Sequence, residues 1–469
     1  MTLQDADALR RAILARQVSA VEVCRASLDR IDSLNSLNAF ITVDQEGALR
    51  RASALDRGAA GANDLPLLGV PIAVKDNICT RGLRTTAGSR ILEHYVPPYS
   101  ATVVERLERA GAVIVGKTNC DEFAMGSSTE HSAFGPARNP SAPDRTPGGS
   151  SGGSAIAVAT GMTPIALGSE TGGSVRQPAA LCGVLGFKPT YGRISRYGLI
   201  AFGSSMDQVG QFANNVKDLA TVLQVLAGPD ARDSSCAARP AEDYSAVLDG
   251  NGRGLRIGVP RALLEDGIEQ GVRAAFVAAL DVLRTAGASL IDVDLPNARY
   301  ATPAYTIVAM AEASSNLGRF DGVRYGHRAD GESLREMYTR TRSAFGREVK
   351  RRVMLGTYVL SGGYYESFYA KAQAVRALLR QDYVTAFEQV DVVATPTSPT
   401  TAFPLGARVD DPLQMYLADI LTVSANLTGL PAISIPCGLS EGLPVGLQLT
   451  GRAWEESMLL RAASVISSQ

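Results

Sequence analysis

Gly148-Gly-Ser-Ser-Gly-Gly-Ser154 is a run of small residues that leads directly into a weakly apolar segment, Ala155 to Thr160. If that segment is a helix, backbone amides and hydroxyl groups converge at its start. A serine–glycine run can also be a flexible linker, but linkers lie between domains and this run lies between two core-like segments. Phosphate binding is disfavoured because the GxxxxGK[ST] spacing is absent. We therefore expect a structured loop, with the linker as the alternative.

A second loop of small residues, Gly168-Ser-Glu-Thr-Gly-Gly-Ser174, follows the short apolar run Pro164 to Leu167. The two glycines before Ser174 allow backbone amides to point inward without obstruction by side chains. An oxyanion hole beside a nucleophile requires this arrangement. The loop therefore makes Ser174 the candidate nucleophile.

A serine nucleophile needs a base, and histidine is the usual one. The chain has three histidines, which are His94, His131 and His327. The first lies in a loop with Tyr and Pro and the last in a charged helical region, and neither has a motif around it. Surface or supporting roles are therefore favoured for both.

Lysine is the other base that can activate a serine. Lys75 ends the apolar segment Gly69-Val-Pro-Ile-Ala-Val74, which has the pattern of a buried strand. Burial would lower the pKa of its ammonium towards the working range of a base. The alternative is an ordinary ion pair, for example between Lys75 and Asp76.

Short apolar runs and amphipathic segments alternate over the whole chain. A capping box at Ser19–Glu22, followed by an apolar stripe, predicts a helix. A unit of helix, glycine and buried strand occurs at 103–115 and again at 272–293. Further strands are expected at 69–74, 255–259, 390–394, 431–436 and 445–449. This alternation predicts an α/β fold with a mixed or mostly parallel sheet and helices on both faces.

Two longer segments differ from this alternation. Residues 228–254 are polar, contain Gly and Pro and have little periodicity, which predicts a long surface connection. Strand-like runs lie on both sides of it, so one shared sheet and two separate domains remain equally compatible. Residues 303–385 are mainly helical by pattern and are expected to cover one edge of the fold.

The composition is that of an average globular protein, with 469 residues, 45% apolar and 20% charged. Disordered and fibrous classes are excluded. The formal net charge is −1, so a nucleic acid would have to be bound mainly by another chain. The longest weakly polar stretch, 155–167, is shorter than the roughly 18 apolar residues that span a bilayer. With an acidic N-terminal segment in place of a basic leader, we expect a cytoplasmic protein without membrane contact.

The cysteines are scattered and show no CxxC spacing. They are Cys24, Cys79, Cys120, Cys182, Cys236 and Cys437. This pattern favours reduced, mostly buried residues over a disulfide framework or a zinc site.

Taken together, Lys75, the GGSSGGS run around Ser150 and the TGGS that ends at Ser174 resemble the signature of the amidase signature family of serine hydrolases. Position by position, the resemblance implies Ser174 as nucleophile, Ser150 as proton shuttle and Lys75 as base. It also implies a cis peptide bond before Ser150. The implied fold is an α/β amidase-signature fold, in which helices cover both faces of a mixed central β-sheet. It would form a single domain over 1–469, with the signature core at about 68–200 and a mainly helical cover at about 303–385.

Three further segments, 121–140, 313–325 and 349–357, resemble the glutamine-hydrolysing members of this family that work in tRNA-dependent amidotransferases. The resemblance implies that glutamine is hydrolysed and that the ammonia converts Glu-tRNA(Gln) to Gln-tRNA(Gln). It implies amidotransferase subunits B and C as partners and tRNA binding through the complex. ATP and Mg²⁺ would be used by the partner subunit, with no cofactor in this chain. The sequence also offers no His/Cys/Asp cluster for a metal.

The resemblance further implies an oxyanion hole and a glutamine pocket. The oxyanion would be held by backbone N–H groups of Thr171, Gly172, Gly173 and Ser174. Glutamine is a zwitterion, so its site needs a cation for the carboxylate and an anion for the ammonium. Arg352 would supply the cation, Asp419 the anion, and Tyr305 would line the pocket. Against this, Arg352 lies in the basic run 347–352, and such runs are usually solvated helix faces.

Two other functions remain as alternatives. A free-standing amidase acting on a small or aryl amide would use the same three residues without Arg352, Asp419 or partner chains. A non-catalytic scaffold subunit would keep only the fold. The intact Lys75, Ser150 and Ser174 argue against the scaffold.

Overall fold

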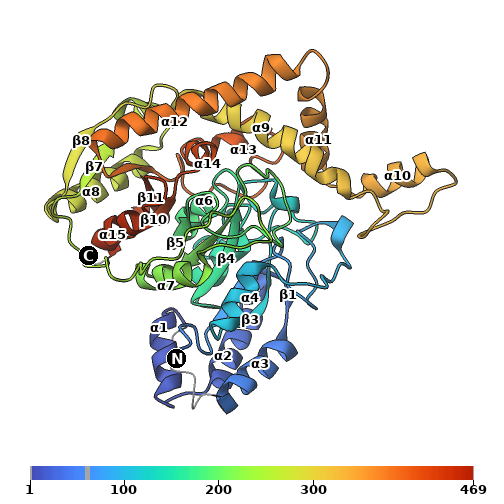
Figure 1. Cartoon of the computed structure of the whole chain (residues 1–469), viewed down its shortest axis with the longest axis horizontal. Helices are drawn as coiled ribbons and strands as arrows, with labels where there is room; N and C mark the ends of the chain where they lie inside the picture. Colours follow the sequence, from blue (N-terminus) through green and yellow to red (C-terminus); the bar gives the residue numbers. More distant parts are fainter. Residues whose placement is uncertain (1–2, 59–63, 468–469) are drawn as a thin grey trace.

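The computed structural model describes residues 3–58 and 64–467 and contains one sheet of eleven strands (Figure 1). The strands are β1 (Phe40–Val43), β2 (Pro71–Lys75), β3 (Val113–Thr118), β4 (Ile165–Glu170), β5 (Leu185–Lys188), β6 (Gln208–Ala213), β7 (Arg256–Val259), β8 (Ser289–Asp292), β9 (Val392–Pro396), β10 (Ala432–Ser440) and β11 (Leu443–Gly451). Their order is β1-β3-β2-β4-β6-β5-β10-β11-β9-β7-β8. Strands β2, β3 and β4 run parallel, as do β7, β8 and β9, whereas the other pairs are antiparallel. The expected mixed sheet is confirmed.

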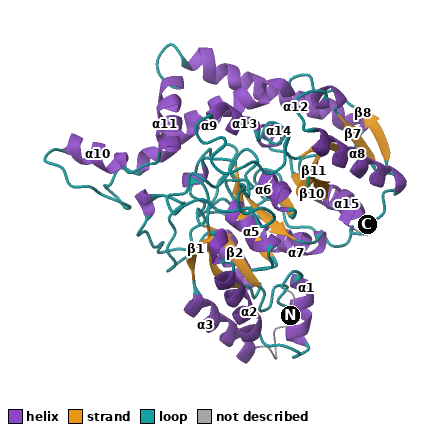
Figure 2. Ribbon diagram, turned by 180° about the vertical axis from the view of Figure 1, so that it is seen from behind, coloured by secondary structure: helices purple, strands orange, loops and turns teal. Residues whose placement is uncertain are grey.

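Helices surround this sheet (Figure 2). They are α1 (Ala6–Leu14), α2 (Ala20–Ser33), α3 (Gln45–Gly58), α4 (Thr102–Arg109), α5 (Gly152–Ala159), α6 (Arg176–Cys182), α7 (Val216–Leu226), α8 (Gln270–Thr285), α9 (Ala301–Asn316), α10 (Leu334–Ser343), α11 (Arg347–Val359), α12 (Lys371–Gln389), α13 (Pro412–Leu417), α14 (Val423–Thr428) and α15 (Glu456–Ser467). Within the described residues, none of them is long and apolar enough to cross a membrane.

Alternate residues of the central strands enter different hydrophobic cores, because successive side chains of a strand point to opposite faces. In β2, Ile72 and Val74 join the core beneath α4, α7, α8 and α15, whereas Ala73 joins the core beneath α2, α3, α5 and α6. In β9, Val393 enters a third core formed with α9, α11, α12 and α14. Helices therefore cover both faces, and the mainly helical segment 303–385 lies over the C-terminal half of one face.

The sheet is continuous across the long connection between α7 and β7. Strands β7 and β8 follow that connection, yet they extend the sheet formed by the earlier strands. The sequence left open a shared sheet or two separate domains, and the structure has the shared sheet. The capping box is also confirmed, because the Ser19 hydroxyl accepts the Glu22 N–H while the Glu22 carboxylate accepts the Ser19 N–H.

The parallel strands β2 and β4 are neighbours, with Val74 opposite Leu167. Their carboxyl ends consequently lie side by side, which brings Lys75 next to the loop that begins after Glu170. In parallel sheets, ligands commonly bind at this edge. Both serine loops of the sequence begin or end here.

Candidate active site

Lys75 lies fully buried at the carboxyl end of β2 and contacts both serine loops. Its Nζ donates hydrogen bonds to Ser150 Oγ at 2.7 Å, to Ser151 Oγ at 2.9 Å and to the Ser169 carbonyl at 3.2 Å. Its acceptors are therefore neutral oxygens. Three donated hydrogen bonds use all three N–H groups of an ammonium; in the neutral amine the contact with Ser150 reverses, and the Ser150 hydroxyl donates to the Nζ lone pair.

Burial lowers the pKa of Lys75 to about 8, and the nearby Cys120, Asp121, Asp207 and Glu170 oppose this shift only in part. The alternative of an ion pair with Asp76 is wrong. Asp76 faces Lys117 on β3, with Nζ and Oδ1 3.6 Å apart. In the described parts of the chain, Lys75 has no carboxylate within ion-pair distance.

The run Gly148–Ser154 is a fixed part of the core, since all its residues are buried. The peptide bond between Gly149 and Ser150 is cis, as the resemblance implied. Helix α5 begins at Gly152, directly after Ser151. The Ser151 N–H donates to the carbonyl of Ser174 at 3.1 Å, which joins the two serine loops. The linker alternative is therefore wrong.

A buried ion pair shapes the loop that carries Ser174. The Glu170 carboxylate accepts the backbone N–H groups of Val175 and Arg176 at 3.0 and 3.1 Å. The Arg176 guanidinium pairs with Glu170 and donates to the carbonyl of Thr422 at 3.0 Å. The Glu170 carboxylate thus joins the two ends of the loop formed by residues 171–174. Within the described residues, the N–H groups of Gly172, Gly173 and Ser174 have no hydrogen-bond partner.

Glycine is required at two positions of this loop. A Cβ on Gly173, where φ is +153°, would lie 2.3 Å from Thr422 Oγ1 and 2.8 Å from Asp419 Oδ1. A Cβ on Gly172 would lie 2.5 Å from the Tyr305 ring. Close approach of the expected pocket residues to the loop therefore depends on the two glycines. The Thr171 hydroxyl is engaged in a separate hydrogen bond, which it donates to Asp207 at 2.6 Å.

Asp419 lies buried beside Gly173 and has one oxygen available. Ser127 Oγ donates to its Oδ2, whereas Oδ1 has no hydrogen-bond partner in the described residues. Burial raises the pKa of Asp419 to about 7. A cationic group of a ligand would satisfy this oxygen and favour the carboxylate.

Arg352 is buried on the inner side of α11, so the solvated-face alternative for this residue is wrong. Its Nε donates to Glu348 Oε1 at 2.7 Å, and its guanidinium lies over the ring of Tyr416. Its charge and that of Asp419 both act on the pKa of Tyr305, which burial raises above the usual value. Asp419 and Tyr305 thus lie against Gly173 and Gly172 of the Ser174 loop, and Arg352 is near enough to Tyr305 for its charge to act on the pKa of the phenol.

Several residues of this site were not predicted from the sequence. They are Ser127, Glu170, Arg176 and Glu348. The spacing of Glu348 and Arg352, four residues apart on a helix, could have indicated their ion pair. The other contacts join distant segments, and no local pattern marks them.

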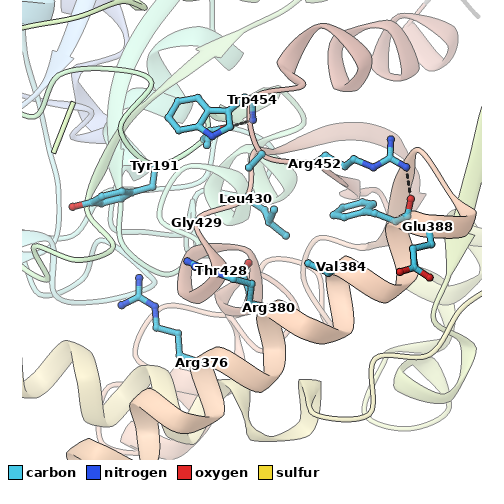
Figure 3. Close-up of a pocket in the computed structure, with 13 residues that line it drawn as sticks. Tyr191, Arg376, Arg380, Val384, Glu388, Thr428, Gly429, Leu430, Arg452 and Trp454 are labelled. Atoms are coloured by element: carbon cyan, nitrogen blue, oxygen red, sulfur yellow. Dashed lines mark hydrogen bonds between the residues drawn. The ribbon is translucent and has the colours of Figure 1, made fainter. Parts of the chain in front are cut away.

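A separate hollow of about 600 Å³ lies between α12 and the segments around Thr428–Leu430 and Arg452–Trp454 (Figure 3). None of the expected site residues lines it. Two of its arginines hydrogen-bond to the protein itself, since Arg376 donates to Leu427 O and Ser205 O, and Arg452 donates to Val390 O. Among the described residues, no group of three or more His, Cys, Asp or Glu side chains could hold a metal ion.

Lys75 lies at the carboxyl end of an inner strand and is hydrogen-bonded to serines of two glycine-rich loops. Serine hydrolases that use lysine in place of histidine have this arrangement. The family model named Amidase matches residues 22–460, and the chain belongs to this family. The family and the α/β amidase-signature fold expected from the sequence are thereby confirmed.

Among its relatives, the A subunit of the glutamyl-tRNA(Gln) amidotransferase of Roseiflexus sp. (strain RS-1) is 56% identical over 463 residues, covering 98% of this chain and 94% of that protein. The protein of the same name from Anaeromyxobacter dehalogenans (strain 2CP-C) is also 56% identical over 463 residues, covering 97% and 94%. The corresponding A subunit from Thermotoga maritima, a solved structure, is 42% identical with a TM-score of 0.79, covering 96% and 94%. A peptide amidase from Stenotrophomonas maltophilia is 32% identical with a TM-score of 0.86, covering 99% and 96%.

Proposed function

We propose that this chain is the glutamine-hydrolysing subunit of a glutamyl-tRNA(Gln) amidotransferase. It hydrolyses glutamine to glutamate and ammonia, and the ammonia converts Glu-tRNA(Gln) to Gln-tRNA(Gln). Relatives of that name have a higher sequence identity to it, 56% and 42%, than the peptide amidase has, 32%. The observation that carries the choice of glutamine is a buried cation, Arg352, and a buried anion, Asp419, around one loop. A simple amide would use neither charge.

In the first half of the reaction, neutral Lys75 accepts a proton from Ser150, which in turn accepts the proton of Ser174. The Ser174 oxygen attacks the side-chain amide carbon of glutamine, and the N–H groups of Thr171, Gly172, Gly173 and Ser174 stabilise the oxyanion. The Ser174 hydroxyl makes no hydrogen bond among the described residues. The contact with Ser150 would form as substrate binds, as catalytic hydrogen bonds often do.

The same relay then runs in reverse. Protonated Lys75 returns its proton through Ser150 to the amide nitrogen as the C–N bond breaks, so ammonia leaves and a glutamyl ester remains on Ser174. A water molecule attacks the ester while its proton passes through Ser150 to Lys75. The proton then returns to Ser174, glutamate leaves, and the three side chains regain their starting states.

Replacing Arg352 with glutamine tests the choice of substrate. We expect kcat/KM for glutamine to fall about tenfold to a hundredfold, mostly through KM, because a charge-assisted hydrogen bond contributes about 1.5–3 kcal/mol. Turnover of an uncharged amide such as propionamide should change by less than threefold. Steady-state assays with both substrates give the comparison.

The matched control is Arg347→Gln, which removes an exposed arginine from the same helix. It should leave both activities of the isolated chain unchanged. Equal losses on glutamine and propionamide in Arg352→Gln would argue for a free-standing amidase and against a glutamine pocket.

The pH profile of kcat/KM should rise in two steps. Lys75 must be neutral to act as a base, so activity increases as pH rises through about 8. Asp419 must be ionised to bind an ammonium, so a second step lies near pH 7 in the free enzyme. An uncharged amide does not use Asp419 and should show the step near 8 alone. A flat profile between pH 6 and 8.5 would contradict the role of Lys75.

We further propose that amidotransferase subunits B and C are the partners and that tRNA binds through them. The balance of 46 basic and 47 acidic residues supports this division, since the chain has no excess of cations for a polyanion. ATP and Mg²⁺ would be used by the tRNA-binding partner, and this chain would need no cofactor of its own. Because aminoacyl-tRNA is a cytoplasmic molecule, the proposal puts the chain in the cytoplasm.

A further inference from the structure

The turn from α11 to α12 lies at an outer corner of the molecule in both views (Figures 1 and 2), and an exposed cluster of aromatic side chains is formed by residues at this turn. The exposed fractions of Tyr358, Tyr364 and Phe368 are 48%, 39% and 37%. No residue of the π-helical turn Tyr365–Ala370 is buried. Large aromatic groups are rarely left in water together unless another surface covers them.

The cluster is ordered by contacts among its own rings. The ring centroid of Tyr358 lies 4.3 Å from that of Tyr364 and 6.4 Å from that of Phe368, and Tyr364 and Phe368 are 6.0 Å apart. Side chains that already support one another lose little conformational freedom on binding. Tyrosine is also enriched in the centres of protein–protein interfaces.

Helix α11 continues this surface, because it has apolar residues on two opposite sides. Its inner side packs so closely on α9 that a Cβ on Gly356 would lie 1.9 Å from the Met310 carbonyl. On the outer side, Met354 and Leu355 are 71% and 43% exposed. A helix that packs on one side only would have polar residues at these positions.

The outer side of α11 is basic at its start. Lys350 and Arg351 line an open hollow of about 650 Å³ together with Met354 and Leu355. Lys350 donates to the carbonyl of Ser343, an acceptor that carries no formal charge. A surface that fits this hollow needs carboxylates opposite the basic end and apolar side chains opposite the other.

We propose that the outer side of α11 from Lys350 to Tyr358, together with Tyr364 and Phe368, is the docking face for a partner subunit of the amidotransferase. The partner presents an apolar depression for the aromatic cluster and a carboxylate for Lys350. This inference rests on the proposed function.

The charges along the face favour a protein over a nucleic acid. Stacking surfaces for single-stranded nucleic acids combine aromatic rings with interleaved cations. Residues 355–370 contain no Lys or Arg and one Glu, Glu366. The rings also contact one another, so bases would have to displace these contacts.

The position of the face suits the proposed reaction. Arg351 on the outer side and Arg352 in the candidate pocket both pair with Glu348. A partner seated here would therefore lie across a single helix from the glutamine pocket. Ammonia released at Ser174 needs a nearby second active site if it is not to be lost to water.

The test is binding of the full chain to the two partner subunits, B and C, measured by calorimetry and sedimentation. We expect the double variant Tyr358→Ser/Tyr364→Ser and the variant Lys350→Glu each to bind at least tenfold more weakly than the unaltered chain. Glutamine hydrolysis by the isolated chain should stay within threefold. The matched control, Val277→Ser on α8, removes an apolar side chain that is 49% exposed and should bind normally.

The outcomes separate this inference from the proposed function. If the unaltered chain binds the two partner subunits and the Tyr358/Tyr364 variant binds equally well, the docking face is wrong and the function stands. If the unaltered chain binds neither of them, the proposed function fails and the docking face fails with it. Loss of tRNA binding by the isolated chain, or of its self-association, with partner binding intact would assign the face to another ligand and overturn the inference.

Discussion

Replacement of Lys75 by arginine is expected to lower kcat/KM for glutamine about a thousandfold or more. Arginine keeps the positive charge but cannot become neutral near pH 7, so it cannot accept the proton from Ser150. The same loss is expected for Lys75→Met, which removes the amine and leaves no buried charge. Steady-state glutaminase assays give the rates, and circular dichroism with thermal unfolding shows whether the variants fold.

His131→Ala provides the comparison, because the environment of Lys75 makes a histidine base unnecessary. Its activity should remain within a few-fold of that of the unaltered chain. Substantial turnover by Lys75→Arg would refute the assignment of the base. A loss in His131→Ala of the size expected for Lys75→Arg would favour a histidine mechanism.

Ser174→Ala is expected to reduce kcat about 10⁴-fold or more, since removal of a nucleophile leaves only binding and oxyanion stabilisation. Glutamine should still bind, because Arg352 and Asp419 are untouched. Rate measurements and calorimetric titration with glutamine test the two statements separately. Ser154→Ala is the control from the neighbouring loop, because its hydroxyl donates to Leu167 O at 2.8 Å and makes no hydrogen bond with Lys75. It should retain activity within a few-fold.

Much of the fold could be predicted because its signals are local. The expected strand 69–74 is β2, and the expected helix–glycine–strand units are α4 with β3 and α8 with β8. Strands β1, β4, β5 and β6 were not predicted; residues 168–170 of β4 were expected in a loop, Leu185–Lys188 is short, and Gln208–Ala213 has polar residues that are buried in the sheet. The order of the strands depends on pairings between distant segments, which periodicity does not encode.

The candidate catalytic residues were easier to predict from the sequence than the residues of the candidate glutamine pocket. Lys75 and Ser150 lie 75 residues apart and are joined by a hydrogen bond in the structure, as their resemblance to the family signature implied. The single residues Arg352, Asp419 and Tyr305 have no distinctive local motif. Charge patterning even favoured a solvated Arg352, because the run 347–352 does not reveal which side of the helix faces α9. The packing of α11 against α9 decides which side of the helix is buried. In the sequence, Gly356 is the local feature that indicates this close packing.

Identifying the atom that carries the acyl group tests most directly whether Ser174 is the nucleophile. The chain is mixed with glutamine, quenched in acid during turnover and digested, and the peptide with the added mass of one glutamyl group is sequenced by mass spectrometry. We expect an ester on Ser174, absent in Ser174→Ala and in samples without glutamine. A glutamyl group on Ser150 or Ser151 would contradict this assignment.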